Sequence, residues 1–246
     1  SLGSNDSIAC CNIMLNTAVA EELSQFADQL EGSKDINKAV HDLVLKTIKE
    51  HKRIIFNGNG YSDEWVKEAE KRGLMNLKTT PDALAHLCDK KNADVLKKHG
   101  VFNDVELKSR YEIYNDNYTK VINIEALTMI DMTKKLYLPA ASAYGKKLAD
   151  SVTVKTSIGV DSTYETDVAK NAGKLTASIF NKVQTLEKAI AAAKDVTEAD
   201  KAAVYYKESV IPAMNELRAN VDELEGLMPS CEWPVPSYGD LLFSVR

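Results

Sequence analysis

Apolar residues recur at intervals of three and four along almost the whole chain, and this period constrains the fold more than any other feature. Such spacing places the apolar side chains on one face of an α-helix, which must then pack against another element. The pattern therefore predicts an all-α protein, a multi-helix bundle, whose first two helices cover residues 7–30 and 35–52. The apolar face of the first helix consists of Met14, Leu15, Ala18, Val19, Leu23, Phe26, Ala27 and Leu30.

Residues that start and stop helices separate these segments. Gly32 is expected to end the first helix, and Gly73 should close a helix that begins after Ser62. Between them, residues 53–60 form a short apolar run broken by Asn-Gly, which predicts a turn, with or without a stub of strand. The remaining signals are the cap and proline of Thr80–Pro81, the helix end at His99–Gly100, and a capping box of Asn103 with Glu106.

Two long helices of the second half contain an internal proline. A long central helix over residues 103–150 should be kinked at Pro139, because proline removes one backbone hydrogen bond. For the same reason, a helix over residues 197–227 should be kinked near Pro212.

The segments around these helices are more polar. Residues 151–166 are rich in Ser and Thr, contain Gly159, and predict an exposed connection. A helix over residues 164–194 should then pair antiparallel with the helix that follows the short Asp195–Val196 link. The tail, residues 229–243, contains three prolines and is expected to be extended.

Charge and composition exclude several classes of partner. A net charge of -5 and a pI near 5.5 argue against nucleic acid and against an anionic membrane, since both select basic surfaces. No apolar run approaches the roughly 20 residues that span a bilayer, so we expect a soluble protein. Cys10, Cys11, Cys88 and Cys231 match neither a disulfide framework nor a CxxC metal pair, which favours the cytoplasm and buried thiols.

Motifs that could carry chemistry are weak. His86 and Cys88 are two residues apart and cannot share a helical face, so they make a poor metal-ligand pair. Gly58 and Gly60 lack the lysine of a phosphate-binding loop, and a turn with positive φ explains them better. We therefore predict no catalytic, cofactor-binding or metal-binding residue in this chain.

Two features remain as candidate interaction or buried polar sites. A stripe on the long helix combines apolar and aromatic residues with Glu125, which should find a hydrogen-bond or ion-pair partner if it is buried, and Asp131 lies nearby. The stripe comprises Tyr111, Tyr114, Tyr118, Val121, Glu125, Met129, Met132 and Leu136. The tail should dock, either on its own domain or on a neighbouring subunit, through Trp233, Tyr238, Leu241, Leu242 and Phe243.

Several long blocks in fixed order resemble one family. They are similar to the segment that follows the catalytic fold in type III glutamine synthetases, and the likeness is weakest over residues 146–227. Residues 3–9 and 15–17 resemble the helix start of that family, although Cys11 replaces a family proline. The blocks are 53–65, 70–74, 76–80, 109–113, 123–132, 138–140 and 233–243.

The resemblance implies a parent enzyme that joins glutamate and ammonia to glutamine through a γ-glutamyl phosphate. It also implies ATP, Mg²⁺ or Mn²⁺, and a dodecamer of stacked rings. The chain lacks an initiator Met, so we expect a fragment, inactive alone. The resemblance implies that the family's metal-binding glutamate and substrate-binding arginine would lie just before the first residue of this sequence. No family catalytic residue can therefore be placed on this sequence.

The resemblance also predicts a division of the chain. Residues 1–55 would end the catalytic domain, and residues 56–246 would form a helical extension typical of type III enzymes. We expect the extension to pack against the catalytic domain or neighbouring subunits; the alternatives are a regulatory binding module and an independent helical interaction domain. If the helix over residues 7–30 normally packs on the catalytic sheet, this chain should expose that face or bury it by self-association.

Overall fold

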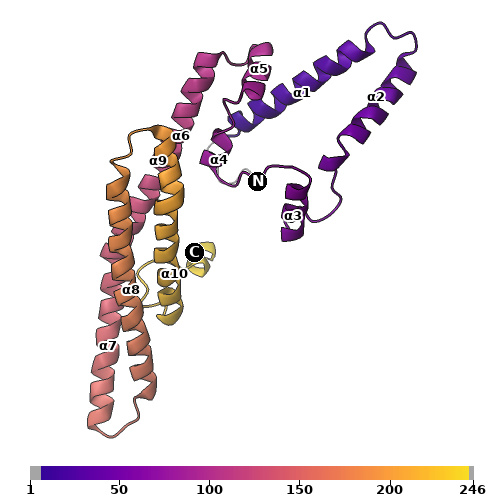
Figure 1. Cartoon of the computed structure of the whole chain (residues 1–246). Coiled ribbons are helices and arrows are strands. Elements are labelled where there is room, and N and C mark those ends of the chain that lie inside the picture. The colour runs from indigo at the N-terminus through magenta and orange to yellow at the C-terminus, as the bar shows by residue number, and fades with distance from the viewer. Residues whose placement is uncertain (1–6, 244–246) are drawn as a thin grey trace. The chain divides into compact units, whose positions relative to one another are not determined.

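A computed structural model describes residues 7–243, and within that range the chain is helical without a β-strand (Figure 1). The all-α prediction is confirmed. No helix in this range combines the length and the hydropathy that a bilayer crossing requires. The chain divides into two compact units, one ending at Ile113 and the other beginning at Tyr114. This division does not test the predicted boundary between residues 55 and 56, which stays a prediction.

The first unit opens with two long helices, α1 (Ala9–Leu30) and α2 (Ile36–Glu50), joined by a tight reversal. Gly32 takes a left-handed φ of 75°, which ends α1 as predicted. Glycine suits this position because a side chain would strain that conformation. The carboxylate of Asp35 then accepts a hydrogen bond from the Lys38 amide at 3.1 Å and caps α2.

The segment after α2 contains no strand. A single 3₁₀ turn, η1 (Lys52–Ile54), leads into an irregular turn, so the predicted turn is confirmed and the alternative with a stub of strand is wrong. Helix α3 (Asp63–Lys71) is capped by Ser62, whose hydroxyl accepts from the Trp65 amide, and ends at Gly73 with φ 73°. Both signals for α3 are therefore confirmed.

Two short helices, α4 (Thr80–Leu84) and α5 (Lys90–Lys98), precede the long helix α6 (Asp104–Met132). The cap of α4 is Thr79 rather than Thr80, since the Thr79 hydroxyl accepts from the Asp82 amide. Helix α5 ends at Gly100, with φ 65° as the pattern predicted. A small core of Leu96, Phe102 and Leu107 holds α5 against the start of α6.

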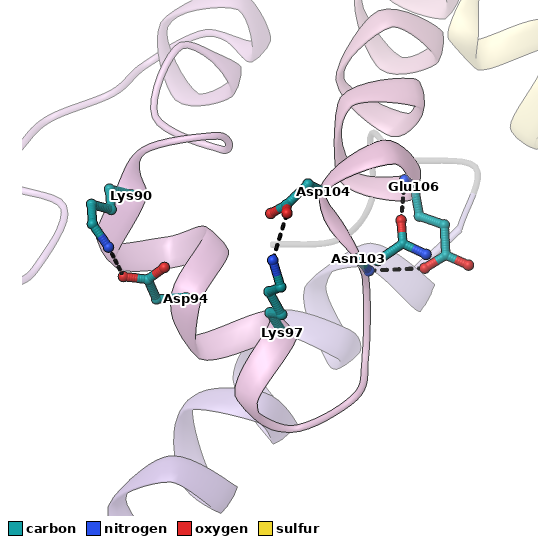
Figure 2. Close-up of polar contacts among 6 residues, drawn as sticks. All are labelled: Lys90, Asp94, Lys97, Asn103, Asp104 and Glu106. Carbon is teal, nitrogen blue, oxygen red and sulfur yellow. Dashed lines mark hydrogen bonds and ion pairs between the residues drawn. The ribbon is translucent and has the colours of Figure 1, made fainter.

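Local polar contacts set the register where α6 begins (Figure 2). The Asn103 amide donates to the Glu106 carboxylate and the Glu106 amide donates to the Asn103 side chain, both at 2.9 Å, which confirms the capping box. Figure 2 also shows Lys97 of α5 pointing toward Asp104 across the turn between the two helices. The two side chains form an ion pair at 2.6 Å.

Both internal prolines follow a segment of π-helix. Helix α6 continues through η2 (Thr133–Tyr137) into α7 (Leu138–Ser157), with Pro139 in the first turn of α7. In η2 the Leu138 amide donates to the Thr133 carbonyl five residues back, which is the π pattern. Widening of the helix just before a proline accommodates its ring and its missing N–H.

The same arrangement occurs at the second proline. Helix α9 (Ala199–Tyr205) runs through η3 (Tyr206–Val210) into α10 (Ile211–Leu227), with Pro212 in the first turn of α10. The sequence therefore predicted where these two helices become irregular, but it did not predict that the irregular segments are π-helical.

Helix α8 (Thr163–Ala193) is the centre of the second unit, and it packs against both α7 and α10 (Figure 1). The predicted antiparallel pair of α8 with α9–α10 is confirmed. The predicted connection over residues 151–166 is mostly wrong, because α7 continues to Ser157. Packing against α8 and an ion pair of Lys155 with Glu165 at 2.6 Å keep this polar stretch helical.

A continuous apolar core fills the space between these helices. Leu186, Val183 and Ile179 of α8 are fully buried, and Leu217 and Leu224 of α10 face them. The rest of the core comes mainly from Ala126, Ile130, Ala141, Tyr144, Leu148, Val168, Ile190, Tyr206, Val210, Ala213 and Val221.

The tail after α10 is not uniformly extended. The Trp233 amide donates to the Pro229 carbonyl at 3.2 Å and forms a turn, and a short helix, α11 (Tyr238–Leu242), follows. A capping box of Ser237 with Asp240 starts α11. Local side-chain caps therefore replace part of the extended conformation that the prolines predicted.

Candidate interaction surfaces

The α1–α2 hairpin exposes the apolar face that its sequence pattern predicts. Leu15 is 65% exposed and Leu23 is 61% exposed on α1, and Val44 is 50% exposed on α2. Thr17 is the only buried residue in the whole of α1, and α2 contains none. The two helices therefore lack a core of their own along most of their length.

The exposed face is hollowed between the two helices. A groove of about 430 Å³ lies between them, and its walls are almost entirely apolar. An open apolar groove of this size is typical of a surface that another element covers. Its lining residues are Leu23, Phe26, Ala27, Leu30, Val40, Leu43, Val44, Thr47 and Ile48.

Polar contacts hold the middle of α1 against α5. The Glu21 carboxylate accepts hydrogen bonds from Lys98 at 2.9 Å and from the His99 ring at 2.6 Å. The bond from Lys98, with those from Gln25 and His99, lowers the pKa of Glu21 to about 2. Sequence reasoning missed this cluster because its members are almost 80 residues apart.

The turn after η1 is fixed by one arginine that follows α3. Arg72 donates to the backbone carbonyls of Arg53 and Ile55 at 3.2 and 3.1 Å, and it lies over the Trp65 ring. Phe56 stacks on that indole, with ring centroids 4.1 Å apart. The turn is therefore organised by α3 and its C-terminal end.

The glycines of this turn do not have the conformation predicted for them. Among residues 7–243 the glycines with positive φ are Gly32, Gly73, Gly100 and Gly159, so the prediction of positive φ at Gly58 and Gly60 is wrong. Glycine suits position 58 for a different reason, which is lack of space: a Cβ atom there would lie 2.6 Å from the Phe56 ring. Gly60 has no atom close enough to exclude a side chain.

The five tail residues predicted to dock behave differently from one another. Trp233 is half-buried and stacks on Tyr137, with ring centroids 5.1 Å apart, and its indole Nε1 is buried without a hydrogen-bond partner. The tail is also held by Lys147, which donates to Glu232 at 2.5 Å. The other four residues of the set are exposed, and their docking on the own domain or on a neighbouring subunit stays a prediction; the four are Tyr238, Leu241, Leu242 and Phe243.

Glu125 and Asp131, the candidate buried polar residues, are both exposed. Asp131 pairs with Lys135 one turn away at 2.5 Å. The predicted stripe is half-buried at its three tyrosines, Met129 and Met132, but Val121 and Leu136 are exposed. The buried face of α6 passes instead through Ala126 and Ile130, each one position after a residue of the predicted stripe. The small side chain of Ala126 lets α6 approach the core there.

A second groove, of about 450 Å³, lies between the end of α6, the segment η2, α10 and the tail. Leu217 and Val221 form its floor, and Tyr137 and Trp233 form an aromatic wall. Burial and the neighbouring carboxylate of Glu225 raise the pKa of Tyr137. Glu125 also lines this groove, and Asp131 does not.

The cysteines and histidines do not form a cluster. Within residues 7–243 no group of three or more His, Cys, Asp or Glu side chains is placed to hold a metal ion. Cys10 and Cys11 are half-buried, whereas Cys88 and Cys231 are exposed, so the expectation of buried thiols fails for two of the four. Exposure of these two thiols follows from their positions in turns before α5 and after α10.

Comparison with known proteins gives these surfaces a context. Residues 39–156 match the family model described as "Glutamine synthetase C-terminal domain". This chain belongs to the glutamine synthetase family. The matched range includes most of α2, all of α3 to α6, and nearly all of α7.

Three curated relatives of this glutamine synthetase segment agree with that assignment. The glutamine synthetase of Butyrivibrio fibrisolvens is 39% identical over 86% of the chain, and the alignment covers 31% of that protein. The "Type-3 glutamine synthetase" of Dictyostelium discoideum is 33% identical over 98% of the chain and 34% of its own length. The enzyme of Bacteroides fragilis is 29% identical over 98% of the chain and 35% of its own length. The chain thus spans about a third of the length of these relatives.

Proposed function

We propose that this chain is the structural, non-catalytic C-terminal region of a type III glutamine synthetase. The observation that carries the proposal is the uncovered apolar face of α1 and α2, in a chain that spans about a third of its relatives' length. Burying one aliphatic side chain contributes about 1.5–3 kcal/mol, so a face of this kind is a strong packing surface once a partner element covers it.

In this proposal the face packs on a part of the enzyme that this chain does not span. Residues 1–55 would then end the catalytic domain, and residues 56–246 would add an extension that contacts the catalytic domain or neighbouring subunits. The exposed aromatic and aliphatic residues of α11 offer a second contact surface for such an assembly.

The whole enzyme would form glutamine from glutamate and ammonia in the cytoplasm. ATP would phosphorylate the γ-carboxylate of glutamate, ammonia would displace the phosphate, and Mg²⁺ or Mn²⁺ would neutralise the phosphate charge. The assembly would be a homo-oligomer, a dodecamer of stacked rings. None of this chemistry is assigned to a residue of the present chain.

The test is a charge placed inside the α1–α2 groove of the full-length enzyme. Val44→Asp puts a carboxylate on the groove wall, and we expect it to reduce both the mass of the assembly in light scattering and the γ-glutamyl transfer activity. Asn37→Asp is the matched control, because it adds the same charge at an exposed position of α2 outside the groove.

The two substitutions separate packing through this face from a general effect of added negative charge. Loss of assembly with Val44→Asp but not with Asn37→Asp supports packing through this face. An enzyme with Val44→Asp that retains its full mass and activity would show that the groove stays open to solvent, and the proposal would then be wrong.

A regulatory binding module is the second candidate function. The observation that favours it is the groove beside Tyr137 and Trp233, which has an aromatic wall and carboxylates at its rim. Truncation of residues 56–246 distinguishes the two roles: a structural region should be needed for the assembly, whereas a regulatory one should change only regulation or substrate affinity.

A further inference from the structure

The groove between α6, η2, α10 and the tail has the composition of a binding site, and the proposed structural role does not use it. Its volume of about 450 Å³ is sufficient for a small organic molecule. The floor is formed by side chains of the main core, so a ligand there would rest on a packed surface. We propose that this groove binds a small organic cation, an ammonium or guanidinium group attached to an apolar body.

The charge at the rim selects a cation. Glu125 projects from α6, and Asp222 and Glu225 project from α10, while Arg218 is the single basic residue of the lining. Arg218 is already paired with Asp222 at 3.2 Å. The side-chain carboxylates of Glu125 and Glu225 have no hydrogen bond or ion pair to any residue within 7–243, so two carboxylates remain available. An incoming cation would therefore meet a negative rim.

The aromatic wall suits the same ligand. Tyr137 and Trp233 stack with an interplanar angle of 12°, and Met129 and Met132 line the groove beside them. Aromatic faces attract cations through their quadrupole, and indole is the best of them. Thioether side chains adapt to irregular apolar groups. The carboxylates at the rim thus match an ammonium group. The aromatic and thioether side chains inside the groove match the apolar body attached to it.

Contacts around the groove hold its aromatic wall in place. Tyr137 is the last residue of the π segment η2 and stacks on the tail, and Lys147 pairs with Glu232, the residue just before Trp233. Trp233 is thereby fixed both by its ring and by its chain neighbour, so the wall needs no ligand to form. A π segment beside the groove agrees with a binding role, since such segments are frequent at functional sites.

The test uses NMR of the 246-residue chain, with phenethylammonium as the probe. The sequence contains only two tryptophans, so a ¹⁵N spectrum shows two indole N–H peaks, and Trp65→Phe identifies the peak of Trp233. We expect a saturable shift of the Trp233 peak with phenethylammonium, and a much weaker one with 2-phenylethanol, which has the same shape without the charge. High salt should weaken the binding, because the rim is exposed.

Carboxylate variants complete the test. Glu125→Gln and Glu225→Gln should each weaken binding about threefold, and the double variant about tenfold, as expected for exposed charge pairs. Glu223→Gln, on α10 but outside the groove, is the control and should bind as the unmodified chain does. Circular dichroism verifies that every variant is folded.

Three results would overturn the proposal. The first is a folded chain whose Trp233 peak shows no saturable shift up to about 20 mM of the probe, a concentration at which even weak binding would be seen. The second is equal binding of 2-phenylethanol, which would leave only an apolar pocket. The third is unchanged affinity in the double glutamine variant. None of these outcomes bears on packing through the α1–α2 groove, so the two proposals fail independently.

Discussion

Replacement of Leu186 by alanine tests the central packing of the second unit. Leu186 lies in α8 and is 0% exposed, and the cluster around it joins α7, α8 and α10. The change removes three carbon atoms from a closed core. Loss of the burial of these atoms lowers the free energy of unfolding by about 2.4 kcal/mol, and the cavity left behind brings the total loss to about 3–5 kcal/mol.

The expected change in melting temperature follows from the size of the unit. The second unit runs from Tyr114 to Arg246, and for a domain of this size 1 kcal/mol lowers the Tm by about 4 °C. The substitution should therefore lower the Tm of this unit by about 10–20 °C. Fluorescence of Trp233 reports on this unit alone in a Trp65→Phe background, and urea titration gives the free energy of unfolding.

Leu127→Ala is the matched control for this experiment. Leu127 is 49% exposed on α6, so the same three atoms are removed from a site that remains in contact with water. We expect a loss of about 1 kcal/mol or less there. If Leu186→Ala also costs under about 1 kcal/mol, or if the two variants are equally destabilised, then Leu186 is not enclosed and the packing described for α8 is wrong.

Two further predictions concern the first unit. Because the pKa of Glu21 is lowered from 4.5 to about 2 in the folded chain, its ionised form stabilises α1 on α5 above pH 4.5, and this contribution is lost as pH falls toward 2. The urea midpoint of the unmodified chain should thus approach that of Glu21→Gln on acidification. Gly58→Ala should push the Phe56 ring away from Trp65 and change the Trp65 fluorescence, because the added Cβ lies 2.6 Å from that ring.

Controls for these two experiments are present in the chain. A gap between the unmodified chain and Glu21→Gln that stays constant from about pH 6 to pH 2 would contradict the assigned role of the carboxylate. Gly60→Ala adds the same methyl group where nothing lies within 4 Å, so its spectrum should match that of the unmodified chain. Identical spectra for Gly58→Ala would show that Phe56 does not lie against the backbone there.

Much of the secondary structure could be predicted because its signals are local. The apolar period places the helices, and Gly32, Gly73 and Gly100 end them with the left-handed φ that glycine accepts most easily. The capping box of Asn103 and Glu106 needs only residues three apart. Each of these interactions is closed within one turn of chain, so the sequence alone contains it.

The main predictions that proved wrong concern features that depend on contacts between residues distant in the sequence. Residues 151–157 are polar enough for a loop, yet packing on α8 keeps them helical. Glu125 belongs to an apolar pattern, but the core lies against Ala126 one position away, so Glu125 faces outward. A period read from sequence gives the face of a helix to within about one residue, which is too coarse to place a single carboxylate.

The sequence by itself determined that this chain is helical, where most helices end, and which family it resembles. Tertiary structure decided which surfaces remain open: the uncovered α1–α2 groove, the groove beside Tyr137 and Trp233, and the exposed α11. The physical reason is the range of the interactions. Helix formation is governed by neighbours a few residues away, whereas exposure depends on which distant segments supply enough apolar area to cover a face.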